Sequence, residues 1–262
     1  MPDHESARPS PDVASPDATP AAASSISWVR IGRYRCHLAQ PVAEQDLRRL
    51  VAALAGRGRF HAEPSNGDVL SGRSAIWRHE LPAIGTVVIK EYRRGGMLRF
   101  IRRRFYVRIG ATRPEREFHN LRAAREAGLN VPEPVVSCSR GWLVYRGWLV
   151  TRLIVGRSLV EVVRAGTDGL PGLLDDLTRQ VGLLIERRVA HVDLHPGNVF
   201  ISDTDRVYLL DFDRATAFRK PIGELRRQYD VRWRRAVEKH GLPAVLADRF
   251  SEGLGRLSLP GG

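Results

Sequence analysis

The chain contains little cysteine and no long apolar run, and both facts limit the classes of protein to which it can belong. Its two cysteines, Cys36 and Cys138, are far apart in the sequence and have no metal-type spacing, which fits a reducing cytosol. No segment approaches the roughly 18 apolar residues that a membrane-spanning helix needs. The first residues, which include Asp3, Glu5 and Asp12, lack the basic-then-apolar order of a signal peptide. We therefore expect a protein that is soluble or peripheral to a membrane, on its cytoplasmic side.

Acidic residues are also few relative to basic ones. The 262 residues include 42 Lys+Arg and 29 Asp+Glu, which gives a formal net charge of +13. Such a charge favours an anionic partner, such as nucleic acid, an anionic membrane surface or a phosphorylated substrate. A basic, solvated surface without a partner is an equal alternative. The hydrophobic content of 43% suits one large domain or two small lobes that share a cleft.

The residue patterns divide the chain into three parts. Residues 1–26 are rich in Pro, Ala, Ser and Asp and are expected to form a disordered tail. Residues 27–153 show mostly strand patterns with two helical segments, and residues 154–262 show mostly helical patterns. The sequence therefore predicts a two-lobed α+β fold, with a small β-rich N-lobe and a larger helical C-lobe.

Strands and helices are expected in the following segments. The predicted strands are 27–38, 85–92, 135–137, 142–153, 199–201 and 207–210, and a hairpin is predicted over 68–81. The predicted helices are 44–54, 113–127, 222–240 and 243–254, together with one whose apolar face holds Leu173, Leu174, Leu177, Val181, Leu184 and Ile185. The strand pattern of 142–153 is expected to be broken by a turn at Arg146 and Gly147.

Lysine is scarce, and this makes Lys90 conspicuous. The chain has three lysines, and all its other basic side chains are arginine. Lys90 ends the strand 86–90, where a compact ammonium suits phosphate oxygens as a point charge. We interpret it as a contact to the α- and β-phosphates of a nucleotide; the alternative is a strand-end lysine that reaches water.

A lysine in that role needs a carboxylate to hold its geometry. Glu117, on the helix that follows, is the natural candidate because it flanks the buried face. Glu115 competes with it but lies on a different face of the helix, and a solvated carboxylate is the alternative for either. A glycine-containing segment with Gly67, Gly72 and Ser74 could cover phosphates through backbone N–H groups, although an ordinary hairpin turn explains it nearly as well.

Two segments, HVDLHPGN over 191–198 and VYLLDFD over 207–213, carry the most specific pattern. They place two carboxylates and one carboxamide on loops beside apolar strands. Asp193 would accept the proton of an attacking hydroxyl, and Asn198 and Asp211 would hold the magnesium ions that bridge nucleotide phosphates. The pattern therefore predicts phosphoryl transfer.

The other polar residues of these segments have supporting roles in this interpretation. His191 is expected to bond the backbone, and His195 to pack the loop or contact substrate, because hard magnesium prefers oxygen ligands. Asp211 and Asp213 are placed at the end of a strand, two residues apart, so their side chains should start on the same side. Asp213 is expected to pair with a nearby arginine or to assist the site.

These residues resemble the protein-kinase-like superfamily, and within it the lipopolysaccharide kinase family. The resemblance rests on Val88-Ile89-Lys90, Arg116-Glu117-Phe118, HVDLHPGN and LLDFD, and it covers about residues 60–240. Two elements narrow it to the kinases of 3-deoxy-D-manno-octulosonic acid (Kdo) in that family. They are Arg93-Arg94-Gly95-Gly96 after the lysine strand and Asp211-Phe212-Asp213-Arg214 in place of the Asp-Phe-Gly of protein kinases.

The resemblance implies ATP-dependent phosphorylation of the 4-hydroxyl of Kdo attached to lipid A, with ATP and Mg²⁺ in the cleft. It gives Asp193 the role of base, Asn198 and Asp211 the role of metal ligands, and Lys90 with Glu117 the positioning of phosphates. It also implies a monomer, peripheral on the cytoplasmic face of the inner membrane, with no nucleic-acid partner. Two positions depart from the kinase pattern. Asp213 replaces glycine, which argues against activation-loop switching, and Arg152 stands at the presumed hinge, where relatives often carry an acidic residue.

An arginine-rich segment, 92–116, supplies much of the positive charge. It holds nine arginines and one acidic residue, Glu115, with apolar residues interleaved. A helix here would be amphipathic and basic, which suits an anionic lipid surface or a nucleic acid; internal salt bridges and a solvated face are the alternative. Two other functions stay open from the sequence: a kinase of core heptose, of a small molecule or of a protein, and a non-catalytic basic nucleic-acid-binding protein.

Overall fold

The computed structural model describes residues 27–56, 75–92, 106–108, 110–166 and 169–257. Its first part is an antiparallel seven-stranded sheet in the order β1-β2-β6-β7-β4-β3, with β5 paired to β7. The strands are β1 (Ser27–Ile31), β2 (Tyr34–Leu38), β3 (Ala75–Leu81), β4 (Gly85–Glu91), β5 (Tyr106–Val107), β6 (Pro134–Arg140) and β7 (Val144–Arg152). Two helices accompany this sheet, α1 (Glu44–Gly56) and α3 (Arg113–Glu126).

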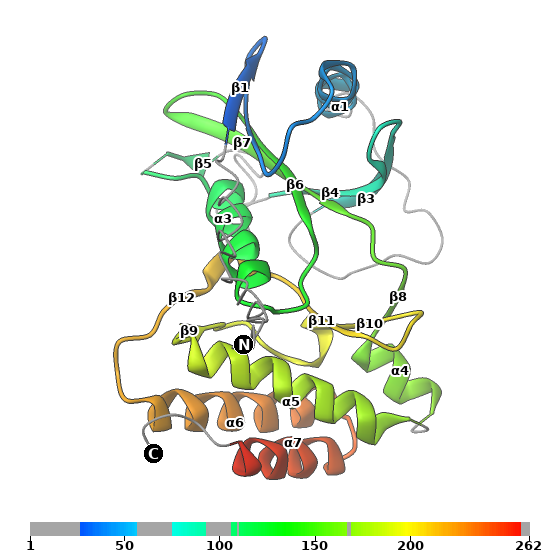
Figure 1. Ribbon diagram of the computed structural model, residues 1–262, viewed down its shortest axis with the longest axis vertical. Helices are drawn as coiled ribbons and strands as arrows, with labels where there is room; N and C mark the ends of the chain where they lie inside the picture. Colours follow the sequence, from blue (N-terminus) through cyan, green and yellow to red (C-terminus); the bar gives the residue numbers. More distant parts are fainter. Residues whose placement is uncertain (1–26, 57–74, 93–105, 109, 167–168, 258–262) are drawn as a thin grey trace, which may run out of the picture.

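The second part is mainly helical, and Figure 1 shows its helices stacked at the end of the molecule away from β1 and α1. Its helices are α4 (Leu159–Ala165), α5 (Leu170–Glu186), α6 (Ile222–Lys239) and α7 (Val245–Arg256). Its short strands are β8 (Gly156–Ser158), β9 (Val189–Ala190), β10 (Val199–Ser202), β11 (Val207–Leu209) and β12 (Thr216–Ala217). The predicted α+β fold, with a β-rich lobe followed by a helical one, is confirmed.

Two hydrophobic cores hold these parts together. One lies between the sheet and α1, whose Leu47, Leu50 and Leu54 are buried. The other fills the helical part and includes Phe118 and Leu121 of α3, which the sequence assigned to the buried face. Because α3 belongs to the core of the helical part while following the sheet strands in sequence, it ties the two parts together.

β7 differs from the prediction, because it runs unbroken through Arg146 and Gly147. Gly147 is buried inside the strand, where a Cβ atom would lie 2.7 Å from the side chain of Pro114. The glycine therefore lets the start of α3 approach the sheet, and it does not mark a turn. The hairpin predicted over 68–81 is also different, since β3 turns into β4 at residues 82–84 and residues 57–74 lie outside the described part.

The two cysteines, distant in sequence, are neighbours in space. Cys36 of β2 lies opposite Cys138 of β6, with their Sγ atoms 2.8 Å apart, and both are buried free thiols. Burial raises the pKa of the Cys138 thiol well above its ordinary value, so the thiolate that reacts with oxidants and alkylating agents is scarce.

Three predicted features fall outside the described residues: the tail 1–26, the glycine-containing segment with Gly72 and Ser74, and most of the arginine-rich segment, 93–105. Within the described part, no helix combines the length and the apolar character that crossing a bilayer would require.

Candidate active site

A cleft of about 820 Å³ lies between the sheet and the helical part. This size is typical of sites for small molecules. Five of the seven residues predicted for the site line it, and the other two, Gly72 and Ser74, lie outside the described residues. The five are Lys90, Glu117, Asp193, Asn198 and Asp211.

Lys90 of β4 contacts two carboxylates at once. Its Nζ donates to both oxygens of Glu117, at 3.0 and 2.9 Å, and to Oδ1 of Asp211 at 2.6 Å. Burial alone would lower the pKa of Lys90, but the charges of Glu117 and Asp211 raise it above its ordinary value, so the amine stays an ammonium. Burial acts in the opposite sense on Asp211, yet the Lys90 charge holds the pKa of that carboxyl below its usual range. The ammonium therefore links the sheet, α3 and the loop after β11.

Glu117 has a second donor directly after β4. The hydroxyl of Tyr92 donates to Oε2 of Glu117. Burial and the nearby charge of Glu117 raise the pKa of Tyr92 well above its ordinary value, so the phenol remains a donor. Lys90 near the end of β4 and Tyr92 directly after it thus approach the same carboxylate.

Glu115, the competing carboxylate, belongs to a different set of contacts. Its side chain accepts the backbone N–H of Thr112 at 2.8 Å in a capping box and lies 3.3 Å from Nε2 of His37. Burial would raise the pKa of Glu115, but these bonds and the nearby Arg108 lower it to about 2. Of the two candidates, Glu117 is the one that the structure pairs with Lys90.

The loop 191–198, between β9 and β10, is fixed by its own hydrogen bonds. The side-chain Nδ2 of Asn198 donates to the backbone oxygen of Asp193 at 2.8 Å. The backbone N–H of Gly197 donates to Nδ1 of His195 at 3.1 Å, and the His195 ring stacks on that of His240. Since the amide nitrogen of Asn198 is engaged, its oxygen is the atom left for a cation.

His191 joins this loop to the strand beyond it. Its Nε2 lies 2.8 Å from the backbone oxygen of Leu210, and its backbone N–H donates to the Tyr229 hydroxyl at 2.8 Å. The ring meets Phe212 edge-on with centroids 4.5 Å apart, and burial lowers the pKa of His191 below its ordinary value. The predicted backbone-bonding role of His191 is confirmed by these contacts.

The prediction that Asp211 and Asp213 project from the end of a strand is wrong. β11 ends at Leu209, Asp211 has a left-handed backbone with φ of 63°, and a 3₁₀ turn covers 212–214. The two carboxylates converge because the chain turns after the strand, and strand alternation plays no part. Carboxylate atoms of Asp193, Asp211 and Asp213 lie within 4.8 Å of one another.

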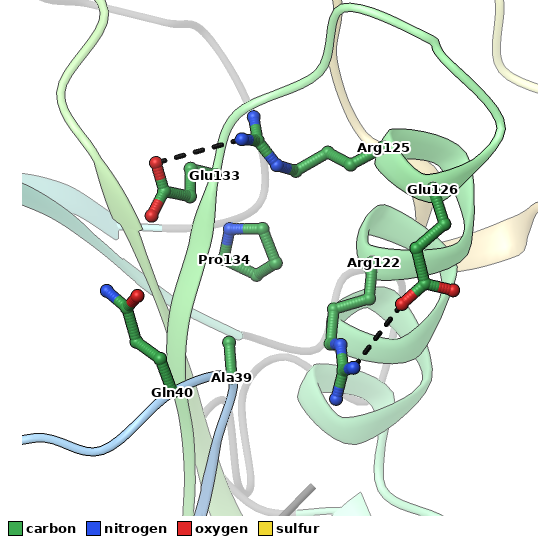
Figure 2. A pocket seen from close by; sticks show the side chains of 7 residues that line it. All are labelled: Ala39, Gln40, Arg122, Arg125, Glu126, Glu133 and Pro134. Atoms are coloured by element: carbon green, nitrogen blue, oxygen red, sulfur yellow. Dashed lines mark hydrogen bonds and ion pairs between the residues drawn. The ribbon is translucent and has the colours of Figure 1, made fainter. Parts of the chain in front are cut away.

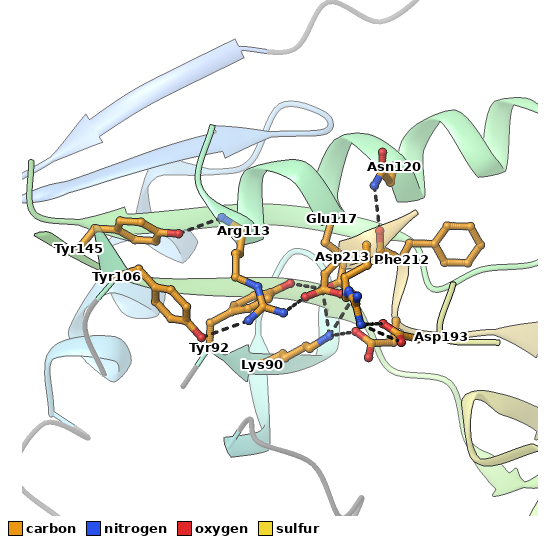
Figure 3. Close-up of polar contacts among 12 residues, drawn as sticks. Lys90, Tyr92, Tyr106, Arg113, Glu117, Asn120, Tyr145, Asp193, Phe212 and Asp213 are labelled. Carbon is orange, nitrogen blue, oxygen red and sulfur yellow. Dashed lines mark hydrogen bonds and ion pairs between the residues drawn. The ribbon is translucent and has the colours of Figure 1, made fainter. Parts of the chain in front are cut away.

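Each of these three carboxylates has its own basic partner, and Figure 3 shows the pair formed by Arg113 and Asp213. Asp211 contacts Lys90 at 2.6 Å, and Asp193 lies 3.2 Å from Nη1 of Arg214. Asp213, which is almost fully buried, accepts from Arg113, as the arginine pairing predicted for it requires. Clustered carboxylate oxygens beside a free amide oxygen are the donors that a hard divalent cation prefers. A magnesium ion therefore fits this donor set.

Asn120 of α3 anchors the loop that carries Asp211. Its Nδ2 donates to the backbone oxygens of Phe212 and Ala215, at 2.8 and 3.0 Å. Together with the Arg113–Asp213 pair, this contact fastens the helix that carries Glu117 to the loop after β11. The expectation that Asp213 disfavours activation-loop switching stays a prediction.

We expect Asn120→Ala to lower the free energy of unfolding by about 1–3 kcal/mol, since two partly buried carbonyls lose their donor. Urea denaturation followed by circular dichroism measures this change. Gln228→Ala is the matched control, because the half-buried Gln228 amide of α6 donates to the Glu224 side chain, at 3.2 Å, and to no other residue in the described part of the chain. An Asn120 variant as stable as this control would show that the anchor contributes nothing.

A smaller depression of about 180 Å³ lies between α3 and β6 and lacks the features of the cleft. Figure 2 shows its two arginines already engaged, Arg122 with Glu126 and Arg125 with Glu133. Because both arginines are paired with carboxylates, we assign no catalytic role to this depression.

Sequence reasoning missed several residues of the cleft region. Tyr92 carried a usable signal, since it lies two residues after Lys90 on the same strand face. Asn120 lies one helical turn after Glu117 and also carried such a signal. Arg214 and His240 gave none, because their proximity to Asp193 and His195 depends on tertiary packing.

Comparisons with known proteins agree on one family. The model of the lipopolysaccharide kinase (Kdo/WaaP) family matches residues 67–232. A 3-deoxy-D-manno-octulosonic acid kinase of Vibrio vulnificus (strain YJ016) is 32% identical over 152 residues, which cover 55% of this chain and 62% of that protein. The enzyme of the same name from Xylella fastidiosa (strain 9a5c) is 30% identical over 190 residues, 70% of this chain and 71% of that protein.

Among solved structures, the bifunctional kinase-methyltransferase WbdD is similar over 66% of this chain and 42% of the WbdD chain, with a TM-score of 0.38 and 19% identity.

The match to the Vibrio vulnificus relative spans less than two thirds of the length of that protein. The family model nevertheless covers more than half of the sequence. The chain belongs to the lipopolysaccharide kinase (Kdo/WaaP) family.

Proposed function

We propose that this protein transfers a phosphoryl group from ATP to the 4-hydroxyl of Kdo attached to lipid A, in the synthesis of the lipopolysaccharide inner core. The observation that carries the proposal is the convergence of the Lys90–Glu117 pair with Asp193, Asn198 and Asp211 in one cleft. Phosphoryl transfer depends on such positioning and on neutralising charge. Family membership and the names of the relatives support Kdo as the acceptor.

In this proposal Asp193 is the base. Its carboxylate takes the proton from the acceptor hydroxyl as the hydroxyl oxygen forms its bond to the γ-phosphorus of ATP, while the bond from that phosphorus to the bridging oxygen breaks and ADP leaves. Asp193 is partly exposed to the cleft, and Arg214 lies beside it. A proton can therefore reach this carboxylate from a bound acceptor, and Arg214 offsets the negative charge that an anionic sugar brings.

The other residues hold the nucleotide. Asn198 and Asp211 would bind Mg²⁺, which neutralises phosphate charge when bound. Lys90 places the α- and β-phosphates, and Glu117 keeps the ammonium in position. Gly72 and Ser74 cover the phosphates in this scheme, as the sequence suggests. Residues 27–153 then form the N-lobe and residues 154–262 the C-lobe, with adenine bound near 151–153.

The hinge arginine already has partners in the structure. Arg152 lies 3.1 Å from Glu133 and donates to the backbone oxygen of Ile84 at 2.6 Å. Its charge is therefore offset within the sheet. We propose that the protein acts as a monomer, peripheral on the cytoplasmic face of the inner membrane, with an anionic surface and Kdo–lipid A as its partners and no nucleic acid.

Mass spectrometry of lipid A that carries one Kdo, incubated with the protein, ATP and Mg²⁺, tests the acceptor. We expect one phosphate to be added to the Kdo residue. Parallel reactions with a heptose-containing core acceptor and with a protein substrate serve as comparisons. Phosphate on either of these and none on Kdo would refute the proposed acceptor, and salt-sensitive nucleic-acid binding without any ATP turnover would refute the kinase itself.

A further inference from the structure

One end of the sheet exposes a group of large apolar side chains. The turn between β6 and β7 presents Trp142, which is 87% exposed, and Leu143, which is 61% exposed. Val144 and Val107 are opposite each other in the pairing of β7 with β5, and both are exposed as well. Adjoining exposed apolar residues of this kind mark a surface that contacts a partner. We call this group, Val107 and Trp142–Val144, the sheet tip.

Arginines surround the sheet tip, and the two hairpins at this end have no acidic residue. Neither residues 27–38 nor residues 134–152 contain Asp or Glu. The turn between β1 and β2 lies at the same end, since Tyr34 pairs with Arg140 across β2 and β6. Arg33 in that turn is exposed. The end of the sheet is therefore apolar at its tip and positively charged around it.

Some arginines of this region are used internally, and others are not. Arg146 forms an ion pair with Glu91 at 2.5 Å, and Arg108 donates to Ser139. In contrast, Arg33 and Arg140 form no ion pair with any other residue that the structure describes. Arg140 lies over the Tyr34 ring, 5.8 Å from its centroid, which leaves its charge without an acidic partner, so both guanidinium charges can meet an anionic partner.

We propose that the sheet tip docks the protein onto an anionic lipid bilayer. A tryptophan beside a leucine suits the boundary between headgroups and acyl chains, where an indole has both apolar and polar surroundings. Arginines around the tip match the negative potential of an anionic leaflet. The apolar tip thus complements the acyl chains of a membrane surface, and the surrounding arginines complement its anionic headgroups.

The sheet tip is connected to the cleft by a row of contacts that Figure 3 displays. Tyr106 and Tyr145 stack with their ring centroids 5.5 Å apart, next to the tip residues. The Tyr145 hydroxyl accepts the backbone N–H of Arg113 at 3.0 Å, and Arg113 in turn pairs with Asp213. Docking through the tip would therefore fix the orientation of the cleft relative to the membrane.

Binding of the full chain to vesicles, measured by co-sedimentation without ATP or acceptor, tests this inference. The vesicles contain phosphatidylethanolamine and phosphatidylglycerol, with phosphatidylcholine vesicles as the neutral comparison. We expect the double variant Trp142→Ser, Leu143→Ser to bind the anionic vesicles about tenfold more weakly or worse, since two apolar side chains no longer insert. Val245→Ser removes a comparable exposed residue on α7, at the far end of the molecule, and should bind as the wild type does.

A second variant separates docking from misfolding. Arg33→Gln with Arg140→Gln should weaken binding to anionic vesicles and reduce its dependence on salt, and leave binding to neutral vesicles unchanged. Unchanged anionic binding of the Trp142 and Leu143 variant would overturn the proposal. So would gel filtration showing a wild-type dimer that this variant dissociates, since the tip would then contact a second copy. Because no phosphate transfer is measured, failure of the proposed acceptor would leave this result unaffected.

Discussion

Asp193→Asn is expected to lower kcat for phosphate transfer about 10³-fold and to leave the KM for ATP nearly unchanged. An amide cannot accept the proton of the acceptor hydroxyl, and a positioned base contributes about 10²- to 10⁴-fold. Among the residues that the structure describes, the Asp193 side chain forms an ion pair with Arg214 alone, at 3.2 Å, and it is partly exposed. The substitution should therefore leave the fold intact, which a circular dichroism spectrum and a thermal unfolding midpoint would verify.

Asp205→Asn provides the matched control. Asp205 lies in the exposed turn between β10 and β11 with φ of 56°, a conformation that asparagine tolerates. The same chemical change outside the cleft should leave kcat within a factor of two or so of the wild type. Steady-state kinetics with Kdo–lipid A as the acceptor measure kcat for both variants. If the Asp193 variant kept the wild-type kcat, Asp193 would not be the base.

The fold could be predicted where one buried face sets the periodicity. The apolar residues assigned to one helix face, from Leu173 to Ile185, are all buried in α5. The strand that carries Lys90 was equally clear because it is β-branched and short. The turn predicted at Gly147 was wrong, since the role of this glycine depends on Pro114 of α3, a contact that no local pattern reveals. Local rules fail where a distant element determines which residue fits.

In the candidate site, too, local sequence patterns predict some features and tertiary contacts decide the others. Lys90, Asp193, Asn198 and Asp211 could be identified because their residue types and spacing suit phosphate chemistry. The loop geometry could not be identified, because the left-handed backbone at Asp211 has no signal beyond a residue type that tolerates it. The partner of Asp213 lies 100 residues earlier in the chain. Sequence spacing thus predicts which groups are used, and tertiary packing decides how each one is held.

Asp211→Asn is expected to reduce phosphate transfer about 10³-fold, because a divalent cation loses a charged ligand. Charge neutralisation by a metal supplies several kcal/mol in phosphoryl transfer, and each 1.36 kcal/mol is a factor of ten in rate. The backbone should tolerate the change, since asparagine adopts the left-handed conformation found at this position. Lys90 keeps its two bonds to Glu117, so the lysine remains paired.

A thermal unfolding midpoint measured against Mg²⁺ concentration distinguishes loss of a ligand from general damage. The wild-type midpoint should rise with Mg²⁺, because a ligand that binds only the folded state stabilises it. The midpoint of the Asp211 variant, which also loses the ion pair with Lys90, should stay at its own metal-free value at every Mg²⁺ concentration. Asp203→Asn, in the exposed turn after β10, should respond as the wild type does. A variant that still gains stability with Mg²⁺ would show that the cation is held by Asp193, Asp213 or Asn198 without Asp211, and the assignment of the metal ligands would have to change.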